Sequence, residues 1–171
     1  ALDAKAAILE QSFFRLLRLV NSMSAAEYLS DSQTLSLRDA DLVKLVSEVC
    51  ESSADLAEQL GIQLKFVCAM DRRVCAIHPA AVEQMLYHLL SNALKFTPAG
   101  GTVTVELKKS GGELLLSVAD TGCGMDEATL GRIFDKFYQG DTSHSKEGNG
   151  LGLALVRRVL EISGGSISVT S

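Results

Sequence analysis

The sequence lacks several features that would assign a function at once. It contains no GxxxxGK(S/T) motif and no GxGxxG after a strand in a βαβ unit, which argues against P-loop and Rossmann nucleotide sites. Its longest stretch without charge runs only from Gln84 to Leu94, short of the roughly 18 residues of a membrane helix. The sequence has 16 basic and 21 acidic residues, and the resulting net charge of −5 disfavours a general nucleic-acid binder.

The four cysteines do not have the arrangement of a metal site. Cys50, Cys68, Cys75 and Cys123 form no CxxC pair and have no metal-like spacing with the three histidines. Cys68 and Cys75 could face each other across a hairpin and form a disulfide. Reduced thiols in a cytosolic domain are the favoured interpretation.

The N-terminal segment has the period of a helix in a bundle. Its apolar residues step by four and three, which is the a/d pattern of a bundle seam. They are Leu2, Ala6, Leu9, Phe13, Leu16, Val20 and Met23. The helix could pack on its own domain, but we favour association with a missing helix or a second chain. Because the chain begins at Ala1 without Met, we expect a piece of a longer protein, with one segment over 1–30 and a domain over 31–171.

The rest of the chain alternates helices with strands. We expect a short strand at 35–37 and then a helix that Asp39 or Asp41 caps and Gly61 ends. Helices are also expected over 79–96, near 126–134 and over 151–162. Strands are expected over 62–70 and 74–77, joined by a tight turn, over 103–107 and 114–118, joined at Gly111-Gly112, and from Ile167 to Val169. This order predicts an α/β two-layer sandwich, with a mixed sheet backed by helices and a long N-terminal helix in front.

Two stretches carry polar side chains that suit a phosphorylated ligand with a planar base. Helical spacing puts His88, Asn92, Lys95 and Phe96 toward one side, and an amide oxygen beside a cation suits hydrated Mg²⁺ and the phosphates it bridges. In 120–125 a strand runs into a carboxylate and two glycines. The carboxylate can accept from an exocyclic amine, and the glycines let the backbone approach a planar ligand.

Two further stretches complete the pattern. Residues 148–153 form a glycine-rich loop that opens a helix, where backbone N–H groups and the helix dipole favour phosphate oxygens. Residues 133–138 are rich in aromatics and are expected to anchor one end of the loop between 125 and 148. Each stretch is weak evidence for a site when taken alone.

Together, in this order and spacing, the four stretches resemble the Asn box, first glycine box, Phe box and second glycine box of the sensor histidine kinase ATP-binding domain. That domain belongs to the Bergerat-fold ATPases, which include gyrase, Hsp90-type and MutL-type proteins. The resemblance rests on SNALKFTPAGGTVTVEL, VADTGCGM, IFDKFYQG and GNGLGLALVRRVLEISGGSISV. The N-terminal heptad pattern resembles the second helix of the dimerisation and phosphoacceptor hairpin.

The resemblance implies a role for each motif residue. Asn92 would bind Mg²⁺, Lys95 would contact phosphates, Phe96 would form a wall, and Asp120 would accept from the adenine amino group. The other implied nucleotide contacts are Gly122, Gly124, Phe137, Gly148, Gly150, Leu151 and Gly152. Residues 138–149 would form the ATP lid.

The sequence also departs from the family pattern. His88 stands where the family usually has a second Asn, and Gln139 stands where an Arg often follows the Phe box. Lys136 or Lys146 would then have to balance the negative charge of the γ-phosphate. No histidine has the context of a phosphoacceptor, so the fragment alone is expected not to phosphorylate itself.

The sequence therefore predicts the ATP- and Mg²⁺-dependent catalytic domain of a two-component sensor histidine kinase. It would transfer the γ-phosphoryl group to a histidine on a helix outside the chain, in the same or a partner subunit. Expected partners are that helix, a response regulator and a second copy of the chain, in a cytoplasmic domain whose parent could be membrane-anchored. Alternatives are a degenerate ATP-binding module without phosphotransfer and a serine kinase of the anti-sigma type, which would not need the heptad helix.

Overall fold

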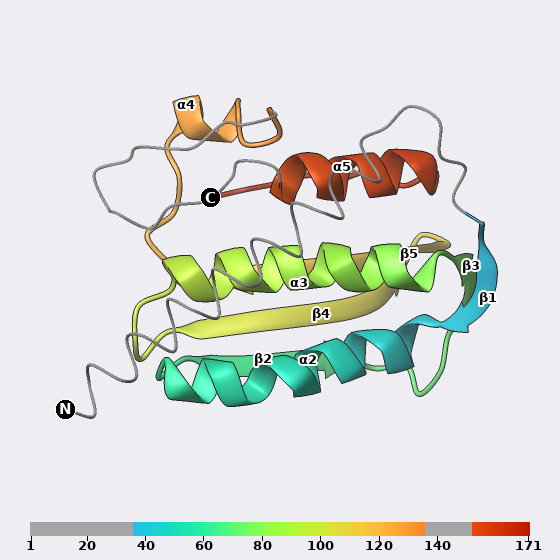
Figure 1. Ribbon diagram of the computed structural model, residues 1–171, viewed down its shortest axis with the longest axis horizontal. Coiled ribbons are helices and arrows are strands. Elements are labelled where there is room, and N and C mark those ends of the chain that lie inside the picture. The colour runs from blue at the N-terminus through green and yellow to red at the C-terminus, as the bar shows by residue number, and fades with distance from the viewer. Residues whose placement is uncertain (1–35, 136–151) are drawn as a thin grey trace.

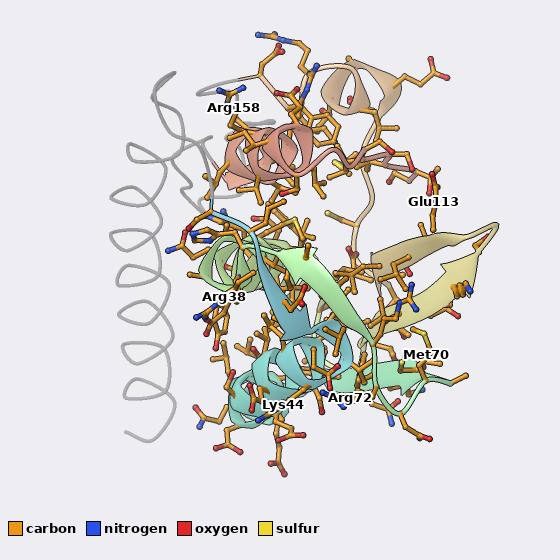
Figure 2. All side chains as sticks on the ribbon, turned by 90° about the vertical axis from the view of Figure 1, so that its right-hand side faces the viewer. Arg38, Lys44, Met70, Arg72, Glu113 and Arg158 are labelled. Carbon is orange, nitrogen blue, oxygen red and sulfur yellow. The ribbon has the colours of Figure 1, made fainter. Side chains whose placement is uncertain are left out.

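The computed structural model describes residues 36–135 and 152–171. In these ranges one layer of helices covers one face of a sheet, an arrangement that Figure 1 shows from the helical side and Figure 2 shows edge-on. The mixed sheet backed by helices confirms the predicted fold class. The helix expected over 1–30 and the lid expected over 138–149 lie outside the described residues.

Three helices form the helical layer: α2 (Leu42–Gln59), α3 (Pro79–Phe96) and α5 (Gly152–Ile162). The bounds of α3 are those predicted from its apolar period. His78 caps α3, because its Nδ1 accepts from the backbone N–H of Ala81 at 3.1 Å, and Pro79 fills the first turn. The short helix α4 (Glu127–Leu130) follows Asp126, whose carboxylate caps it.

The main sheet has the order β2-β4-β5. Strand β2 (Gln63–Cys68) runs parallel to β4 (Thr102–Ser110), and β4 pairs antiparallel with β5 (Glu113–Asp120). The hairpin between β4 and β5 was predicted correctly. Gly111 and Gly112 turn it with φ of 57° and 95°, values that glycine adopts without steric cost.

A second sheet corrects two predictions about the first strands. Strand β1 (Arg38–Asp41) pairs antiparallel with β3 (Val74–Ile77), so the strand expected at 35–37 lies further along the chain. The expected hairpin between 62–70 and 74–77 is wrong, because β2 and β3 belong to different sheets. Backbone contacts at the end of β1 explain the pairing, since the N–H of Leu42 donates to the carbonyl of Arg73 at 2.8 Å.

The separate sheets also bear on the disulfide considered between Cys68 and Cys75. Cys68 and Cys75 lie on β2 and β3, which do not pair with each other, so the hairpin disulfide does not form. All four cysteines lie in the described part of the chain, and all four are thiols. Burial raises the pKa of Cys50 to about 11. The favoured interpretation, reduced thiols, therefore agrees with the structure.

The strand expected from Ile167 to Val169 is also absent from the described C-terminal residues, 163–171. A strand needs a ladder partner, and this segment instead makes a side-chain contact, in which the N–H of Met125 donates to Oγ of Ser171 at 2.6 Å. Ile167 still packs against the core as a partly buried residue.

The core lies between the helices and the inner face of the β2-β4-β5 sheet. Alternate residues of β4, namely Val103, Val105 and Leu107, are fully buried, as period-two alternation requires. From the helices the largest fully buried side chains are Val46, Leu86, Leu90, Leu155, Val156 and Val159. Each such side chain contributes roughly 1.5–3 kcal/mol by leaving water.

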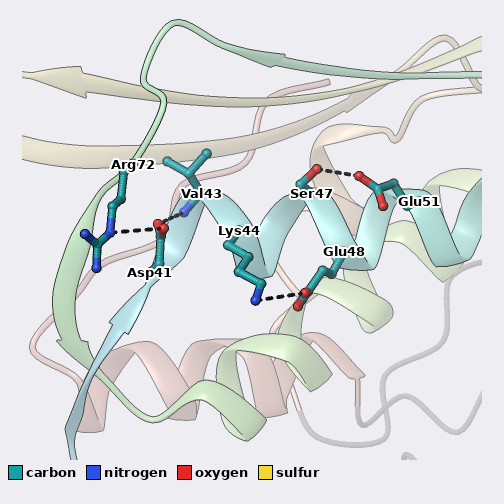
Figure 3. A network of polar contacts seen from close by, with 7 residues as sticks. All are labelled: Asp41, Val43, Lys44, Ser47, Glu48, Glu51 and Arg72. Carbon is teal, nitrogen blue, oxygen red and sulfur yellow. Dashed lines mark hydrogen bonds and ion pairs between the residues drawn. The ribbon is translucent and has the colours of Figure 1, made fainter.

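At the start of α2, Asp41 contacts the loop that precedes β3 (Figure 3). Oδ1 of Asp41 accepts from the N–H groups of Val43 at 3.2 Å and Arg73 at 3.0 Å, and Oδ2 lies 3.7 Å from the guanidinium of Arg72. The hydrogen bond from Arg73 is the main reason that the pKa of Asp41 lies below its usual value. Further along the helix, the contacts of Lys44 with Glu48 and of Ser47 with Glu51 join exposed side chains and add little stability.

Candidate functional site

The end of α3 presents an amide, a cation and an aromatic ring. Asn92 and Lys95 are half-buried, whereas the ring of Phe96 is 48% exposed. Lys95 Nζ lies 5.0 Å from the centroid of that ring, within the range of a cation–π contact. An exposed aromatic face beside an ammonium group can stack on a flat ligand that carries negative charge.

A pocket of about 300 Å³ opens beside Lys95 and Phe96, and Asn92 does not line it. Its lining residues are Lys95, Phe96, Thr97, Pro98, Gly122 and Cys123. The pocket therefore brings together the end of α3 and the loop after β5, which the sequence had marked as two separate motifs. Sequence reasoning missed Thr97, Pro98 and Cys123, although each lies within two residues of a motif residue that it did select.

Asp120 is the last residue of β5, and the loop that follows it helps to hold its carboxylate. Asp120 pairs with Val103 of β4, and the next residue, Thr121, donates its N–H to the carbonyl of Thr102 at 3.1 Å. Oδ1 of Asp120 accepts from the N–H of Gly122 at 2.8 Å. No described residue donates to Oδ2, so the exposed carboxylate can accept a hydrogen bond from a ligand.

Gly122 is fixed by the end of α3. A Cβ at this position would lie 2.6 Å from the carbonyl oxygen of Phe96 and 2.7 Å from Oδ1 of Asp120. Any larger residue would push the loop away from the helix. Gly124 has a φ of 69°, so its backbone conformation also favours glycine.

His88 lies on α3 one turn before Asn92, but it points into the core. Its side chain is only 6% exposed, and burial lowers its pKa to about 4, so the ring is neutral near pH 7. A Cβ on Gly152, the first residue of α5, would lie 2.9 Å from Nδ1 of His88. His88 therefore contacts α5, whereas Lys95 and Phe96 line the pocket.

Among the described residues of the site, the amide oxygen of Asn92 could serve as a metal ligand. Within the described ranges no group of three or more His, Cys, Asp and Glu residues could hold a metal ion. Mg²⁺ commonly keeps several waters and takes one or two protein ligands together with substrate phosphates. A single oxygen from Asn92 fits an ion that arrives with the phosphates rather than a resident metal.

Five predicted site residues, Lys136, Phe137, Gly148, Gly150 and Leu151, lie outside the described residues. The described residues include members of both predicted glycine motifs, and these members contact α3. Gly122 lies against Phe96 at the end of α3, and Gly152 lies against His88. None of the helices in the described ranges has both the length and the apolar character of a membrane span.

Known proteins share this arrangement. The family of histidine kinase-, DNA gyrase B-, and HSP90-like ATPases matches residues 77–171, more than half of the chain, and the chain belongs to that family. The match confirms the resemblance drawn from the four motifs. Because members of this family are ATPases, ATP is the nucleotide that this fold binds.

The curated and solved relatives are sensor kinases. The circadian input-output histidine kinase CikA of Synechococcus elongatus is 34% identical over 161 residues, which cover 91% of this chain and 21% of that protein. Full-length ShkA, solved in complex with AMPPNP, is 31% identical with a TM-score of 0.75, over 92% of this chain and 33% of that one. ThkA, solved with the response regulator protein TrrA, is 22% identical, with a TM-score of 0.71 over 92% and 43%. The chain thus spans about a fifth of the length of the curated relatives it matches first.

Proposed function

We propose that this chain is the catalytic ATP-binding domain of a two-component sensor histidine kinase. In the whole protein it would present Mg-ATP to a histidine on a helix outside the chain. The observation that carries the proposal is the pocket in which Lys95 and Phe96 of α3 meet Gly122 and Cys123, in the loop that follows Asp120. Family membership supports ATP as the ligand, and the kinase relatives support phosphoryl transfer as its use.

The base end of the nucleotide would lie at Asp120. Its exposed carboxylate would accept a hydrogen bond from the exocyclic amine of adenine, while Oδ1 remains held by the N–H of Gly122. Phe96 would cover one side of the bound nucleotide. Gly122 and Gly124 would let the loop backbone approach the base.

The phosphate end would lie toward Asn92, Lys95 and the start of α5. Asn92 would supply one ligand to Mg²⁺, and Lys95 would contact the phosphate oxygens. The motif residues Gly148, Gly150, Leu151 and Gly152 would offer backbone N–H groups, with Phe137 nearby and Lys136 relieving charge at the γ-phosphate. These assignments follow the motif pattern and remain part of the proposal.

The reaction would need little covalent chemistry from this chain. A ring nitrogen of the acceptor histidine would attack the γ-phosphorus, the bond to the β,γ-bridging oxygen would break, and ADP would leave. The residues named here would orient the phosphates and balance their charge, which is the main contribution in phosphoryl transfer.

The chain's own described histidines have other tasks. His78 caps α3 through Nδ1, and His88 is buried against Gly152. These environments support an acceptor outside the chain. The apolar seam over 2–23 in the sequence supports a homodimer. The structure of ThkA with TrrA supports a response regulator as the next partner.

One observation favours a second candidate, an ATP-binding module without phosphotransfer. His88 replaces the second Asn usual in the family, and its buried ring packs on α5, so the phosphate site would have one polar ligand fewer. Incubating the chain, ATP and a separately produced acceptor hairpin distinguishes the two candidates. Acid-labile label on the hairpin supports the kinase, and nucleotide binding without label supports the silent module.

Calorimetry with Mg-ATP tests the proposal itself. Asp120→Asn should weaken binding by about ten- to a hundredfold, because a hydrogen bond to a charged acceptor contributes roughly 1.5–3 kcal/mol. Asn92→Ala should weaken Mg-ATP binding and leave metal-free ATP binding almost unchanged. Asp55→Asn, which removes an exposed carboxylate from α2, is the matched control and should change neither. Equal affinity of the Asp120→Asn variant and the parent chain would overturn the assignment.

A further inference from the structure

The contact between His88 and Gly152 joins the two helices that border the phosphate end of the proposed site. His88 lies on α3, four residues before Asn92, and Gly152 is the first residue of α5. The ideal Cβ position of Gly152 is 2.9 Å from Nδ1, 3.5 Å from Cε1 and 3.6 Å from Cγ of His88. The ring therefore lies against the backbone of α5, in the space that a side chain would take.

The ring of His88 has little room to yield. His88 is 6% exposed, so its ring cannot swing into solvent as the end of a long surface side chain could. Among the residues that the structure describes, none forms a hydrogen bond with its Nε2. The ring is thus held by packing rather than by a hydrogen bond at that atom, and its position responds to the volume of residue 152.

The two ends of the site are held by different contacts. At the base end, Gly122 meets the carbonyl of Phe96, and the β4–β5 hairpin fixes Asp120. At the phosphate end, α3 packs on α5, and His88 lies against Gly152 at the first residue of that helix. A change at residue 152 should therefore move the start of α5 relative to Asn92 and Lys95 and leave the base end in place.

We infer that His88 is a positioning residue that seats the first turn of α5 against α3, and that Gly152 is a glycine because it must accept the His88 ring. This inference rests on the proposed function for its link to nucleotide binding. It assigns Gly152 a role in packing between helices, in addition to the phosphate contact that its motif implies.

Thermal unfolding without nucleotide tests the packing part. Gly152→Ala should lower the melting temperature by about 5 °C or more, since overpacking a filled site is costly. In a His88→Ala background the same substitution should cost less than about 2 °C, because the ring has gone. Gly131→Ala is the matched control: a Cβ there would meet only ordinary contacts, the nearest at 3.5 Å from the carbonyl oxygen of Glu127. An equal loss at residue 152 in both backgrounds, or no loss in either, would overturn the inference.

Ligand binding by the folded variants tests the positioning part. Gly152→Ala should weaken binding of AMPPNP at least tenfold and binding of adenosine, which probes the base end alone, less than twofold. The double variant His88→Ala/Gly152→Ala should regain AMPPNP affinity to within about threefold of His88→Ala. An identical AMPPNP loss in both backgrounds would mean that residue 152 acts only through the phosphates, and would contradict the inference.

If the His88→Ala chain does not fold, the histidine ring signals in NMR show instead whether residue 152 contacts the ring of His88. Gly152→Ala should shift the ring signals of His88 and leave those of His78, the α3 cap, unchanged. Unshifted His88 signals would overturn the inference. A parent chain that binds neither AMPPNP nor adenosine would instead refute the proposed function, while the melting temperatures would still report the packing.

Discussion

The two ends of the proposed nucleotide site are built around different kinds of close contact. At the base end Gly122 approaches a backbone atom, the carbonyl oxygen of Phe96, whereas at the phosphate end Gly152 approaches a side chain, the ring of His88. A backbone partner is present whatever residue occupies position 96. A side-chain partner disappears when residue 88 changes. The need for glycine is therefore absolute at 122 and conditional at 152.

The two ends also differ in their exposure to water. Asp120 is exposed and charged, so it can meet a polar ligand directly. His88 is buried and neutral, so it acts through packing. The base end should therefore respond to changes of ligand chemistry, and the phosphate end to changes of volume and pH.

The largest expected effect comes from Gly122→Ala. Its Cβ would lie 2.6 Å from the Phe96 carbonyl, and the free energy of unfolding should fall by on the order of 3 kcal/mol, the upper end of overpacking effects. Urea unfolding measures this loss. A second substitution, His88→Ala, should not restore stability, in contrast to its effect on Gly152→Ala. Rescue at position 122 would remove the distinction between the two ends.

A smaller effect is expected from acidification. Burial lowers the pKa of His88 to about 4, from the 6.5 of an unperturbed histidine, so the unfolded chain binds the proton more readily. The stability from the neutral ring is complete above pH 6.5 and is lost progressively as the pH falls from 6.5 through about 4. Between pH 7 and pH 5 the loss should be on the order of 2 kcal/mol.

Urea unfolding at the two pH values measures this effect, with His88→Ala as the comparison. The variant should lose much less stability over the same interval. The pKa of Asp41 and that of Asp126 are lowered from 3.8, so the stability that these carboxylates contribute is lost only below this window. An equal pH dependence of variant and parent would show that the ring is not buried as described.

The smallest effect is expected at the start of α2, whose residues do not line the pocket. Asp41→Ala removes the acceptor for the N–H groups of Val43 and Arg73 and should lower the urea midpoint by a modest, measurable amount. Arg72→Ala removes only the exposed partner at 3.7 Å and should leave the midpoint almost unchanged. Nucleotide affinity should be the same in both variants. A large loss of nucleotide affinity in either variant would show that the start of α2 is coupled to the site, and would contradict this prediction.

Local patterns were enough to predict the elements that carry the site. The apolar period over 79–96, with Pro79 at its start, fixed the bounds of α3, and alternation around Gly111-Gly112 fixed the β4–β5 hairpin. The bounds of β3 were also predicted correctly, but no local pattern indicated that it pairs with β1. Their pairing depends on contacts between Asp41, Leu42 and Arg73, which are distant in the sequence.

The candidate site shows the same limit. Asn92, Lys95, Asp120 and the glycines could be selected because family motifs mark residue types at fixed spacing. Cys123 and Pro98 line the pocket only because two motifs meet in space. The packing of His88 on Gly152 was likewise invisible in the sequence, since no local rule relates one helix to the first residue of another.

The most direct test of the account is the choice between ATP and inosine triphosphate, which carries a carbonyl in place of the adenine amine. If Asp120 accepts from that amine, the parent chain should bind ATP at least tenfold more tightly than inosine triphosphate. Calorimetry on Asp120→Asn should show a ratio severalfold smaller. Equal affinity of the parent chain for both nucleotides, or an undiminished ratio in the variant, would contradict the assignment of Asp120 to the base.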